Sequence, residues 1–247
     1  MIKNKFEQDY KALLNRVIND GVDTTNRAGI DTTSLFGQQL TIDLSEGMPI
    51  LTGKMIMFDK AKAEFEWMIS GDDSDKHLID NNVKWWKPWT ENNKILKSYP
   101  HQLRKYNGNF DQLDYAIKEI KKGSRRAYVT MWNPSDLNEQ KLPCCYTGFN
   151  FIRENNNLNL VVHFRSSDVF LGLPYDVLVL SYLLLHVADK TSLEASKLYL
   201  NLANAHIYED HIDESIKITN LSSFPLVKLE NVNNYKSHNF IKTKLII

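Results

Sequence analysis

Two adjacent cysteines, Cys144 and Cys145, stand in the segment KLPCCYTGF and are the only cysteines of the chain. A cysteine becomes a nucleophile when nearby cations lower the pKa of its thiol. The sequence offers the pair Arg125 and Arg126 in SRRAY, and Arg165 in HFRSSD. Paired arginines also form a bidentate clamp for phosphate. Taken alone, the cysteines are more often small buried hydrophobic residues than nucleophiles, and the arginine pair by itself favours a solvated strand end.

A single carboxylate, Asp176, interrupts the apolar stretch LPYDVLV. An ionised aspartate is costly to bury unless something compensates its charge. Two interpretations are open at this point: Asp176 caps the helix that follows, or it faces a ligand. The preceding segment RSSDVFLG offers Arg165 and a serine for an anion, Asp168 as an acceptor and Gly172 for a tight turn.

The elements that position these residues follow from hydrophobic periodicity and turn signals. We found no linker or repeat, so we expect one domain over residues 1–247. A turn-rich RENNN segment predicts a hairpin between the strands 146–152 and 158–164. The predicted helices are 6–20, 58–70, 112–122, 177–188 and 206–218, and the other predicted strands are 34–44, 125–132 and 198–204. This pattern indicates an α+β fold, with one sheet and helices packed on it.

Charge and composition limit the partners of the chain. Thirty basic and thirty acidic residues cancel, so no net field attracts a nucleic acid or a membrane surface. The charged start MIKNKFEQDY lacks the apolar core of a signal peptide, and the longest apolar run is too short to span a bilayer. We therefore expect a soluble, cytoplasmic protein. The spacing of His206 and His211 argues against a helical metal pair, and we expect no metal.

Several segments, in order along nearly the whole chain, resemble the thymidylate synthase family. RSSDVFLGLPYD resembles the family signature, and LPCCYTGFNF resembles its active-site cysteine segment. Further similar segments are NRAG at 26–29, AEFEWMISGD, NNVKWWKPW at 81–89, SRRAYVTMWN, NAHIYEDH at 204–211 and the closing tail HNFIKTKLII. The resemblance implies a thymidylate synthase-like fold with a mixed β-sheet, packed helices and a homodimer formed through the sheet.

The resemblance also implies roles for these residues. Cys144 would add to C6 of a pyrimidine deoxynucleotide, which makes C5 nucleophilic toward the methylene of the co-substrate 5,10-methylenetetrahydrofolate. Glu64 and Tyr99 would transfer protons through ordered water. The residues implied to bind the nucleotide are Arg27, Arg165, Ser166, Ser167, Asp168, His206 and Tyr208, with Arg125 and Arg126 reaching across the dimer interface. Those implied to line the folate site are Trp86, Trp89, Asp168, Leu171, Gly172 and Tyr175.

Asp176 departs from the family, which ordinarily has asparagine at this position. Uracil presents an N3–H donor and an O4 acceptor, which an amide matches. Cytosine presents an N3 acceptor and an N4 donor, which a neutral carboxylic acid matches, or an ionised one if N3 is protonated. Ionised Asp176 facing uracil would leave a mismatch of roughly 1–3 kcal/mol or more. Asparagine caps helices about as well as aspartate, so we interpret Asp176 as a catalytic and substrate-binding residue that reads cytosine.

Two further departures point the same way. Thymidylate synthases have histidine after the nucleophile, in the network around O4 of uracil, and this chain has Cys145. Thymidylate synthases typically have leucine three residues before the nucleophile, where this chain has Lys141. The polarity of Lys141 would favour an ordered water at the reacting methylene. Water at that carbon gives a hydroxymethyl group and tetrahydrofolate, whereas hydride gives methyl and dihydrofolate. This pattern resembles the deoxycytidylate hydroxymethylases, a viral branch of the family.

The leading expectation is therefore a dCMP hydroxymethylase. One alternative is a dCMP methyltransferase with the same residues, and another is a dUMP enzyme, either a thymidylate synthase or a dUMP hydroxymethylase. A third alternative is a catalytically silent nucleotide- or RNA-binding relative. Such a binder would not require Cys144, Glu64, Tyr99 and the arginines together, and the balanced charge gives no footprint for a nucleic acid.

Overall fold

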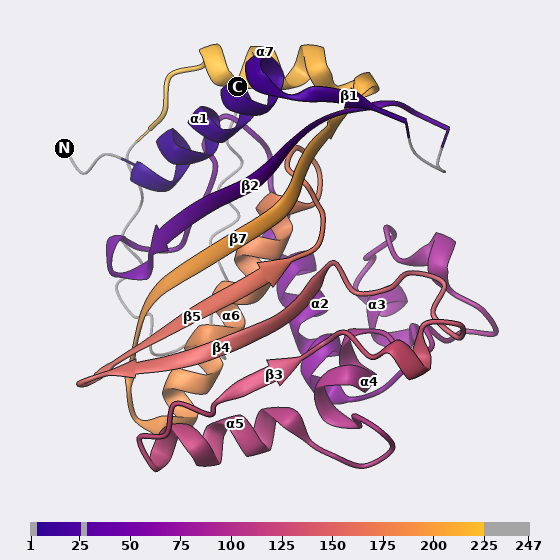
Figure 1. The fold of residues 1–247 in the computed structure, drawn as a ribbon, viewed down its shortest axis with the longest axis vertical. Helices are drawn as coiled ribbons and strands as arrows, with labels where there is room; N and C mark the ends of the chain where they lie inside the picture. Colours follow the sequence, from indigo (N-terminus) through magenta and orange to yellow (C-terminus); the bar gives the residue numbers. More distant parts are fainter. Residues whose placement is uncertain (1–3, 26–28, 225–247) are drawn as a thin grey trace.

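One mixed sheet organises the computed structural model, which describes residues 4–25 and 29–224 (Figure 1). Its strand order is β1-β2-β7-β5-β4-β3, with β6 beside β7. The strands are β1 (Val22–Thr24), β2 (Thr32–Asp43), β3 (Tyr128–Thr130), β4 (Tyr146–Glu154), β5 (Asn157–Phe164), β6 (Ser167–Asp168) and β7 (Glu194–Tyr208). The long strand β7 pairs antiparallel with β2 but parallel with β5 and β6, which makes the sheet mixed.

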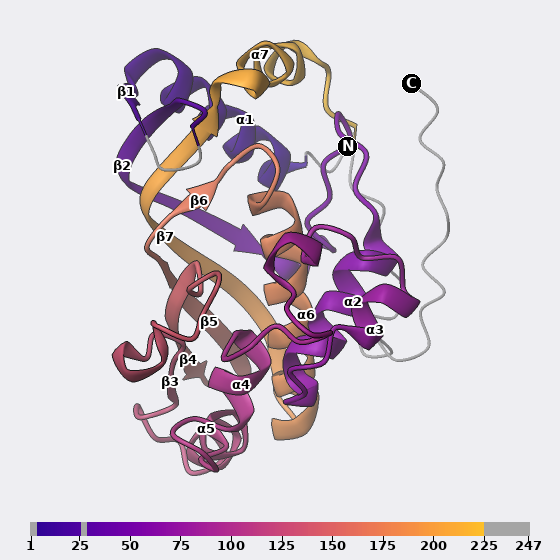
Figure 2. The same cartoon turned by 90° about the vertical axis from the view of Figure 1, so that its right-hand side faces the viewer.

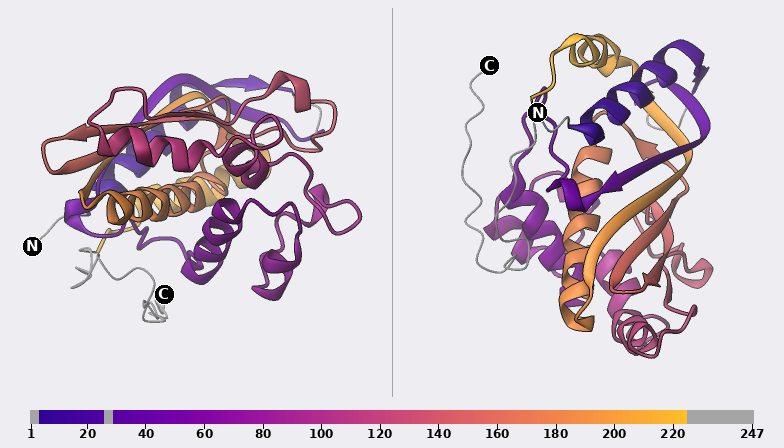
Figure 3. Two further views of the ribbon diagram at one scale, coloured as in Figure 1. Left: turned by 90° about the horizontal axis from the view of Figure 1, so that it is seen from below. Right: turned by 90° about the vertical axis from the view of Figure 1, so that its left-hand side faces the viewer.

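Helices cover one face of this sheet, as Figures 2 and 3 show for α1, α2 and α6. The α-helices are α1 (Lys5–Asp20), α2 (Phe58–Ser70), α3 (Lys76–Asp80), α4 (Tyr99–Arg104), α5 (Gln112–Lys121), α6 (Leu173–Thr191) and α7 (Ile212–Asn220). Short 3-10 turns are η1 (Leu44–Glu46), η2 (Lys87–Trp89), η3 (Pro134–Asp136) and η4 (Glu209–His211). Helix α6 is buried on nearly all sides, because its apolar residues face both the sheet and α2. The predicted α+β fold is confirmed. None of the helices in the described ranges combines the length and the apolar character that crossing a membrane requires.

The helix predicted over 206–218 is wrong at its start. Residues 206–208 complete β7, where Tyr208 pairs with Thr32 of β2 and His206 pairs with Asp168 of β6. Neighbouring strands on both edges supply hydrogen-bond partners here, so the strand outlasts the local helical pattern. Helix α7 begins only at Ile212. This extension carries His206 and Tyr208 to the end of the sheet beside β6.

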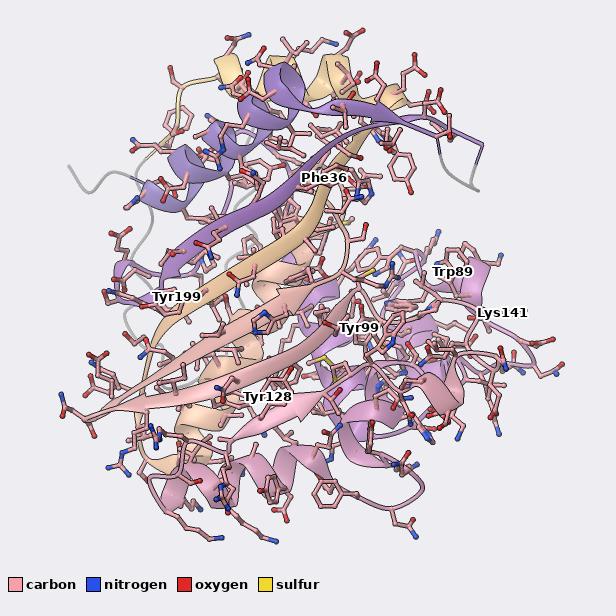
Figure 4. The ribbon with its side chains drawn as sticks, in the orientation of Figure 1. Phe36, Trp89, Tyr99, Tyr128, Lys141 and Tyr199 are labelled. Carbon is pink, nitrogen blue, oxygen red and sulfur yellow. The ribbon has the colours of Figure 1, made fainter. Side chains whose placement is uncertain are left out.

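The opposite face of the sheet is partly apolar and open. Figure 4 shows Phe36, Tyr128 and Tyr199 above the strands β2, β3 and β7 on the side away from α6. Their side chains are 57%, 47% and 37% exposed, respectively. Large exposed aromatic residues on one sheet face are typical of a surface that another protein covers.

A buried carboxylate anchors the loop that follows η1 to helix α1. Glu7 is fully buried and accepts hydrogen bonds from the backbone N–H groups of Thr52 (3.1 Å) and Gly53 (2.8 Å). It also accepts from the Thr52 hydroxyl and from the Asn4 amide (3.2 Å), and its carboxylate lies 3.6 Å from the Lys11 ammonium. One side chain therefore satisfies several buried donors at once.

Substitution of Glu7 by alanine is expected to lower the free energy of unfolding by about 3 kcal/mol or more, because these buried donors lose their acceptor together. Urea denaturation would measure the loss. Asp9→Ala is the matched control on the same helix: it removes only an exposed contact with Lys5 (2.6 Å) and should cost less than about 1 kcal/mol. Similar losses in the two variants would contradict a structural role for Glu7.

Candidate active site

The two cysteines lie immediately before β4, and Arg165 at the end of β5 holds their backbone. Both thiols are free, and Cys144 is buried. The Arg165 side chain donates to the carbonyl of Cys144 (2.9 Å, Nε) and to that of Pro143 (2.7 Å, Nη2). The Arg165 backbone N–H donates to the carbonyl of Cys145 (2.9 Å). The antiparallel pairing of β4 and β5 explains this meeting, since Tyr146 is opposite Phe164.

The Cys144 thiol is protonated in this arrangement. Burial raises its pKa above the usual value, and neighbouring Cys145 raises it further, while the Arg165 guanidinium opposes both effects. Burial likewise raises the pKa of Cys145, with Asp176 as the next cause. A reaction that uses Cys144 as the nucleophile must therefore remove its proton as the new bond forms.

Two further groups with proton-transfer chemistry come from α2 and α4. Glu64 accepts from the indole N–H of Trp86 and from that of Trp85, both at 2.9 Å. Burial raises the pKa of Glu64 to about 7, and the two indole hydrogen bonds limit the rise. Tyr99 is buried, and its hydroxyl accepts from the backbone N–H of Cys145 (2.7 Å). Glu64 can therefore both accept and release a proton near neutral pH, and Tyr99 contacts the cysteine segment directly.

Asp176 lies in the first turn of α6, but it does not cap the helix. The N-cap residue is Gly172, and the described residues provide no side-chain capping bond there. The half-buried Asp176 carboxyl has a pKa well above its usual range, because burial disfavours the charge and both Glu64 and Asp168 repel it. This shift favours the neutral acid, which offers one donor and one acceptor. The capping interpretation is wrong.

Polar groups gather where β6 runs beside the end of β7. The Ser166 hydroxyl lies 3.3 Å from Nδ1 of His206, and the rings of His206 and Tyr208 are 5.4 Å apart. Burial lowers the pKa of His206, which favours the neutral ring. The Ser167 hydroxyl is buried and has no hydrogen-bond partner among the described residues. This group can bind hydroxyl groups or an anion at the end of the sheet.

The turn between β6 and α6 is shaped by Asp168. Its carboxylate accepts from the backbone N–H groups of Phe170 and Leu171, both at 3.0 Å. Gly172 closes the turn, and its backbone N–H donates to the carbonyl of Asp168 (3.1 Å). A Cβ atom on Gly172 would lie 3.3 Å from that carbonyl oxygen and 3.7 Å from Oδ2 of Asp176. Leu171, in this turn, is 45% exposed.

Aromatic rings form a wall beside this turn. Tyr175 packs against Trp85 with ring centroids 4.9 Å apart, and its hydroxyl accepts from the backbone N–H of Met57 (3.5 Å). Trp86 is buried against Trp67 (5.0 Å) and Tyr99 (5.7 Å). The half-buried rings of Tyr175 and Trp85 are the part of this wall that suits a flat aromatic ligand.

Some predicted residues lie apart from this group. Figure 4 shows Trp89, which is half-buried, and Lys141, which is exposed, at the margin of the molecule and away from Tyr99. The Lys141 ammonium lies 3.5 Å from a carboxylate oxygen of Glu91, and its side chain is 44% exposed. The structure therefore does not support the prediction that Lys141 polarises the reacting centre, because its long side chain reaches a surface carboxylate instead.

Three of the four predicted phosphate-binding arginines lie within the described residues. Arg125 and Arg126 are exposed on the segment before β3, and Arg165 is the arginine that contacts the cysteine segment. Arg27 and the tail HNFIKTKLII lie outside the described residues. In the part of the chain that the structure describes, no three His, Cys, Asp or Glu residues come together as a possible metal site.

Sequence reasoning missed two residues beside the site. The resemblance assigns folate contacts to Trp86 and Trp89 and no role to Trp85, which is the second donor to Glu64. Lys54 places its ammonium 3.6 Å from the centroid of the Phe170 ring and donates to the Phe170 carbonyl. Burial lowers the pKa of Lys54 to about 8, and Asp168 opposes this shift. A lone lysine in the apolar stretch LTGKMIMF was the available signal.

Comparisons with known proteins identify the family of the chain. The family model described as thymidylate synthase matches residues 8–246. A thymidylate synthase of Malacoplasma penetrans (strain HF-2) is 32% identical over 290 residues, which cover 97% of this chain and all of that protein. Each match extends over almost the whole chain, including every described element that carries the site. The chain therefore belongs to the thymidylate synthase family, whose enzymes transfer one carbon to a pyrimidine nucleotide and use methylenetetrahydrofolate as co-substrate.

Proposed function

We propose that this enzyme is a dCMP 5-hydroxymethylase, which converts dCMP, 5,10-methylenetetrahydrofolate and water to 5-hydroxymethyl-dCMP and tetrahydrofolate. The observation that carries the base assignment is a carboxyl group at Asp176, where the family ordinarily has an amide, with its pKa raised by burial and by Glu64 and Asp168. A neutral acid can donate its proton to N3 of cytosine and accept from the N4 amino group through its carbonyl oxygen.

A neutral carboxyl can also match uracil if its donor and acceptor exchange places, so hydrogen bonding alone does not select the base. The selective step is proton transfer. Thiol addition to C6 of cytosine is easier when N3 takes up a proton, and the Asp176 carboxyl can supply one there. Uracil needs only a hydrogen bond at O4, which an amide provides without the free-energy cost of keeping a carboxyl neutral. The carboxyl at this position therefore favours cytosine.

The proposed chemistry assigns one task to each group. Cys144 loses its thiol proton as it adds to C6, and C5 attacks the methylene carbon of the folate. Loss of the C5 proton, with cleavage of the bond between that carbon and the folate nitrogen, then releases tetrahydrofolate and leaves an exocyclic methylene on the nucleotide. Water adds to that methylene, the ring electrons return, and Cys144 leaves from C6. Glu64, with a pKa of about 7, can accept the proton from water, while the Tyr99 hydroxyl is available to a neighbouring proton relay. The proposal that water adds to the methylene rests on Glu64, because the Lys141 side chain points to Glu91.

The second candidate is methylation of dUMP. It is favoured by the relative of Malacoplasma penetrans, which is named thymidylate synthase. It is also compatible with a neutral Asp176, which can present its donor to O4 and its acceptor to N3–H of uracil.

We further propose a homodimer formed through the open sheet face, with residues 1–247 acting as one catalytic domain in the cytoplasm. The exposed side chains of Phe36, Tyr128 and Tyr199 support this, because a partner would remove them from water. Arg125 and Arg126 are exposed at the sheet edge next to β3, so they are free to reach the nucleotide phosphate of the partner subunit.

The test is one incubation of the enzyme with equal amounts of dCMP and dUMP and excess methylenetetrahydrofolate, followed by mass spectrometry of the nucleotides. A gain of CH2O on dCMP alone is the expected result. A gain of CH2 on dCMP with formation of dihydrofolate would support the assignment of cytosine as the base, but it would show that the product carries a methyl group. Reaction of dUMP alone would replace the base assignment, and binding without any turnover would favour the catalytically silent relative.

A further inference from the structure

Two consecutive tryptophans converge on one carboxylate. Trp85 donates its indole N–H to Oε2 of Glu64 and Trp86 donates to Oε1, both at 2.9 Å. Each oxygen of Glu64 thus receives one fixed donor. A carboxylate oxygen has a second lone pair, so either oxygen can still accept a proton or a hydrogen bond from water.

The two indoles differ in their surroundings. Trp86 is buried in an aromatic stack with Trp67 and Tyr99. Trp85 is half-buried and packs on Tyr175, with the Lys60 ammonium 6.0 Å from its ring centroid. Trp85 therefore links Glu64 to the aromatic wall of the site, whereas Trp86 links Glu64 to the core.

These hydrogen bonds bear directly on the protonation of Glu64. Burial favours the neutral acid, while donors that point at the oxygens favour the ionised form. The balance leaves the pKa of Glu64 at about 7. Removal of one donor from a carboxylate that depends on it is expected to raise the pKa by roughly one pH unit or more. Loss of one indole donor would accordingly make Glu64 a neutral acid over most of the physiological range.

We propose that Trp85 is a positioning residue that keeps Glu64 ionised and oriented as the base for water, an inference that rests on the proposed hydroxymethyl transfer. In this step the water oxygen bonds to the exocyclic methylene carbon, and one water proton passes to the Glu64 carboxylate. The electron pair of the methylene double bond returns to the ring, where it forms the C5–C6 double bond and expels Cys144 as thiolate. Trp85 touches Glu64 but not the reacting atoms.

Trp85→Phe keeps an aromatic ring near Tyr175, and it removes the N–H donor together with part of the ring area. Because Glu64 must be ionised to accept the proton, the rate of hydroxymethyl formation rises with pH through the pKa of Glu64. In the variant this rise should move upward by about one pH unit, so that the rate at pH 7 falls about fivefold and recovers at higher pH. Infrared difference spectra of the carboxyl stretch, with Glu64→Gln as reference, would measure the same shift without turnover.

Trp67→Phe is the matched control, because its indole N–H donates to the Ser74 carbonyl (3.1 Å) rather than to Glu64. It should lower stability and leave the pH profile in place. A rate loss in Trp85→Phe that is equal at every pH, together with an unmoved carboxyl titration, would overturn the proposal. If the carboxyl titration shifts but the product carries methyl, the effect of Trp85 on Glu64 stands and the proposed hydroxymethyl transfer fails.

Discussion

Replacement of Cys144 by serine is expected to reduce turnover at least about a thousandfold while the nucleotide still binds. A serine hydroxyl at this position has a far higher pKa than a thiol and is a weaker nucleophile toward C6. The contacts that hold the segment should survive, because Arg165 donates to the backbone carbonyls of Cys144 and Pro143 rather than to the thiol of Cys144. Steady-state assays and calorimetric titration with dCMP would measure the two effects.

Cys145→Ser is the control for this experiment. The Cys145 thiol lies 3.9 Å from an Arg165 nitrogen, and its backbone N–H donates to Tyr99, a contact that serine retains. We expect its turnover to fall less than tenfold, a change of at most about 1.4 kcal/mol in the activation free energy. Substantial activity in Cys144→Ser, or an equal loss in both variants, would remove Cys144 as the nucleophile.

The sequence predicted best those elements whose signals are local. Helix α6 and the β4–β5 hairpin follow directly from a continuous apolar run and from a turn-rich RENNN segment. The short strand β6 and the last residues of β7 were missed, because they exist through pairing with each other and with β2. A pattern within one segment carries no information about a partner strand far along the chain.

The site shows the same division. Motif resemblance identified Glu64, Tyr99 and Cys144, and the structure brings the last two to one segment. The resemblance did not reveal which indoles donate to Glu64, because the sequence KWWKPW alone does not distinguish its neighbouring tryptophans. Nor did it reveal that Lys141 turns to Glu91, because a long flexible side chain chooses its partner from the folded surface.

Asp176→Asn is expected to raise the preference for dUMP over dCMP, expressed as the ratio of the two kcat/KM values, by about a hundredfold or more. An amide can turn to hydrogen-bond either base, but it cannot transfer a proton to N3 of cytosine. The loss should therefore appear in kcat for dCMP rather than in KM. The fold should tolerate the change, because Asp176 does not cap α6 and an amide avoids the cost of a charge that burial disfavours at this position.

Assays of both nucleotides with the same enzyme preparation make this experiment its own control, since misfolding would lower both rates and leave their ratio unchanged. The pH dependence adds a second criterion. Asp176 must be protonated to supply N3, so activity toward dCMP should decline as the pH rises through its elevated pKa, and an amide would abolish that decline. A constant ratio and an unaltered profile would mean that Asp176 fills space beside Gly172 without reading the base. A reversed preference would mean that the proton of the Asp176 carboxyl, in the first turn of α6, determines whether the enzyme acts on cytosine or on uracil.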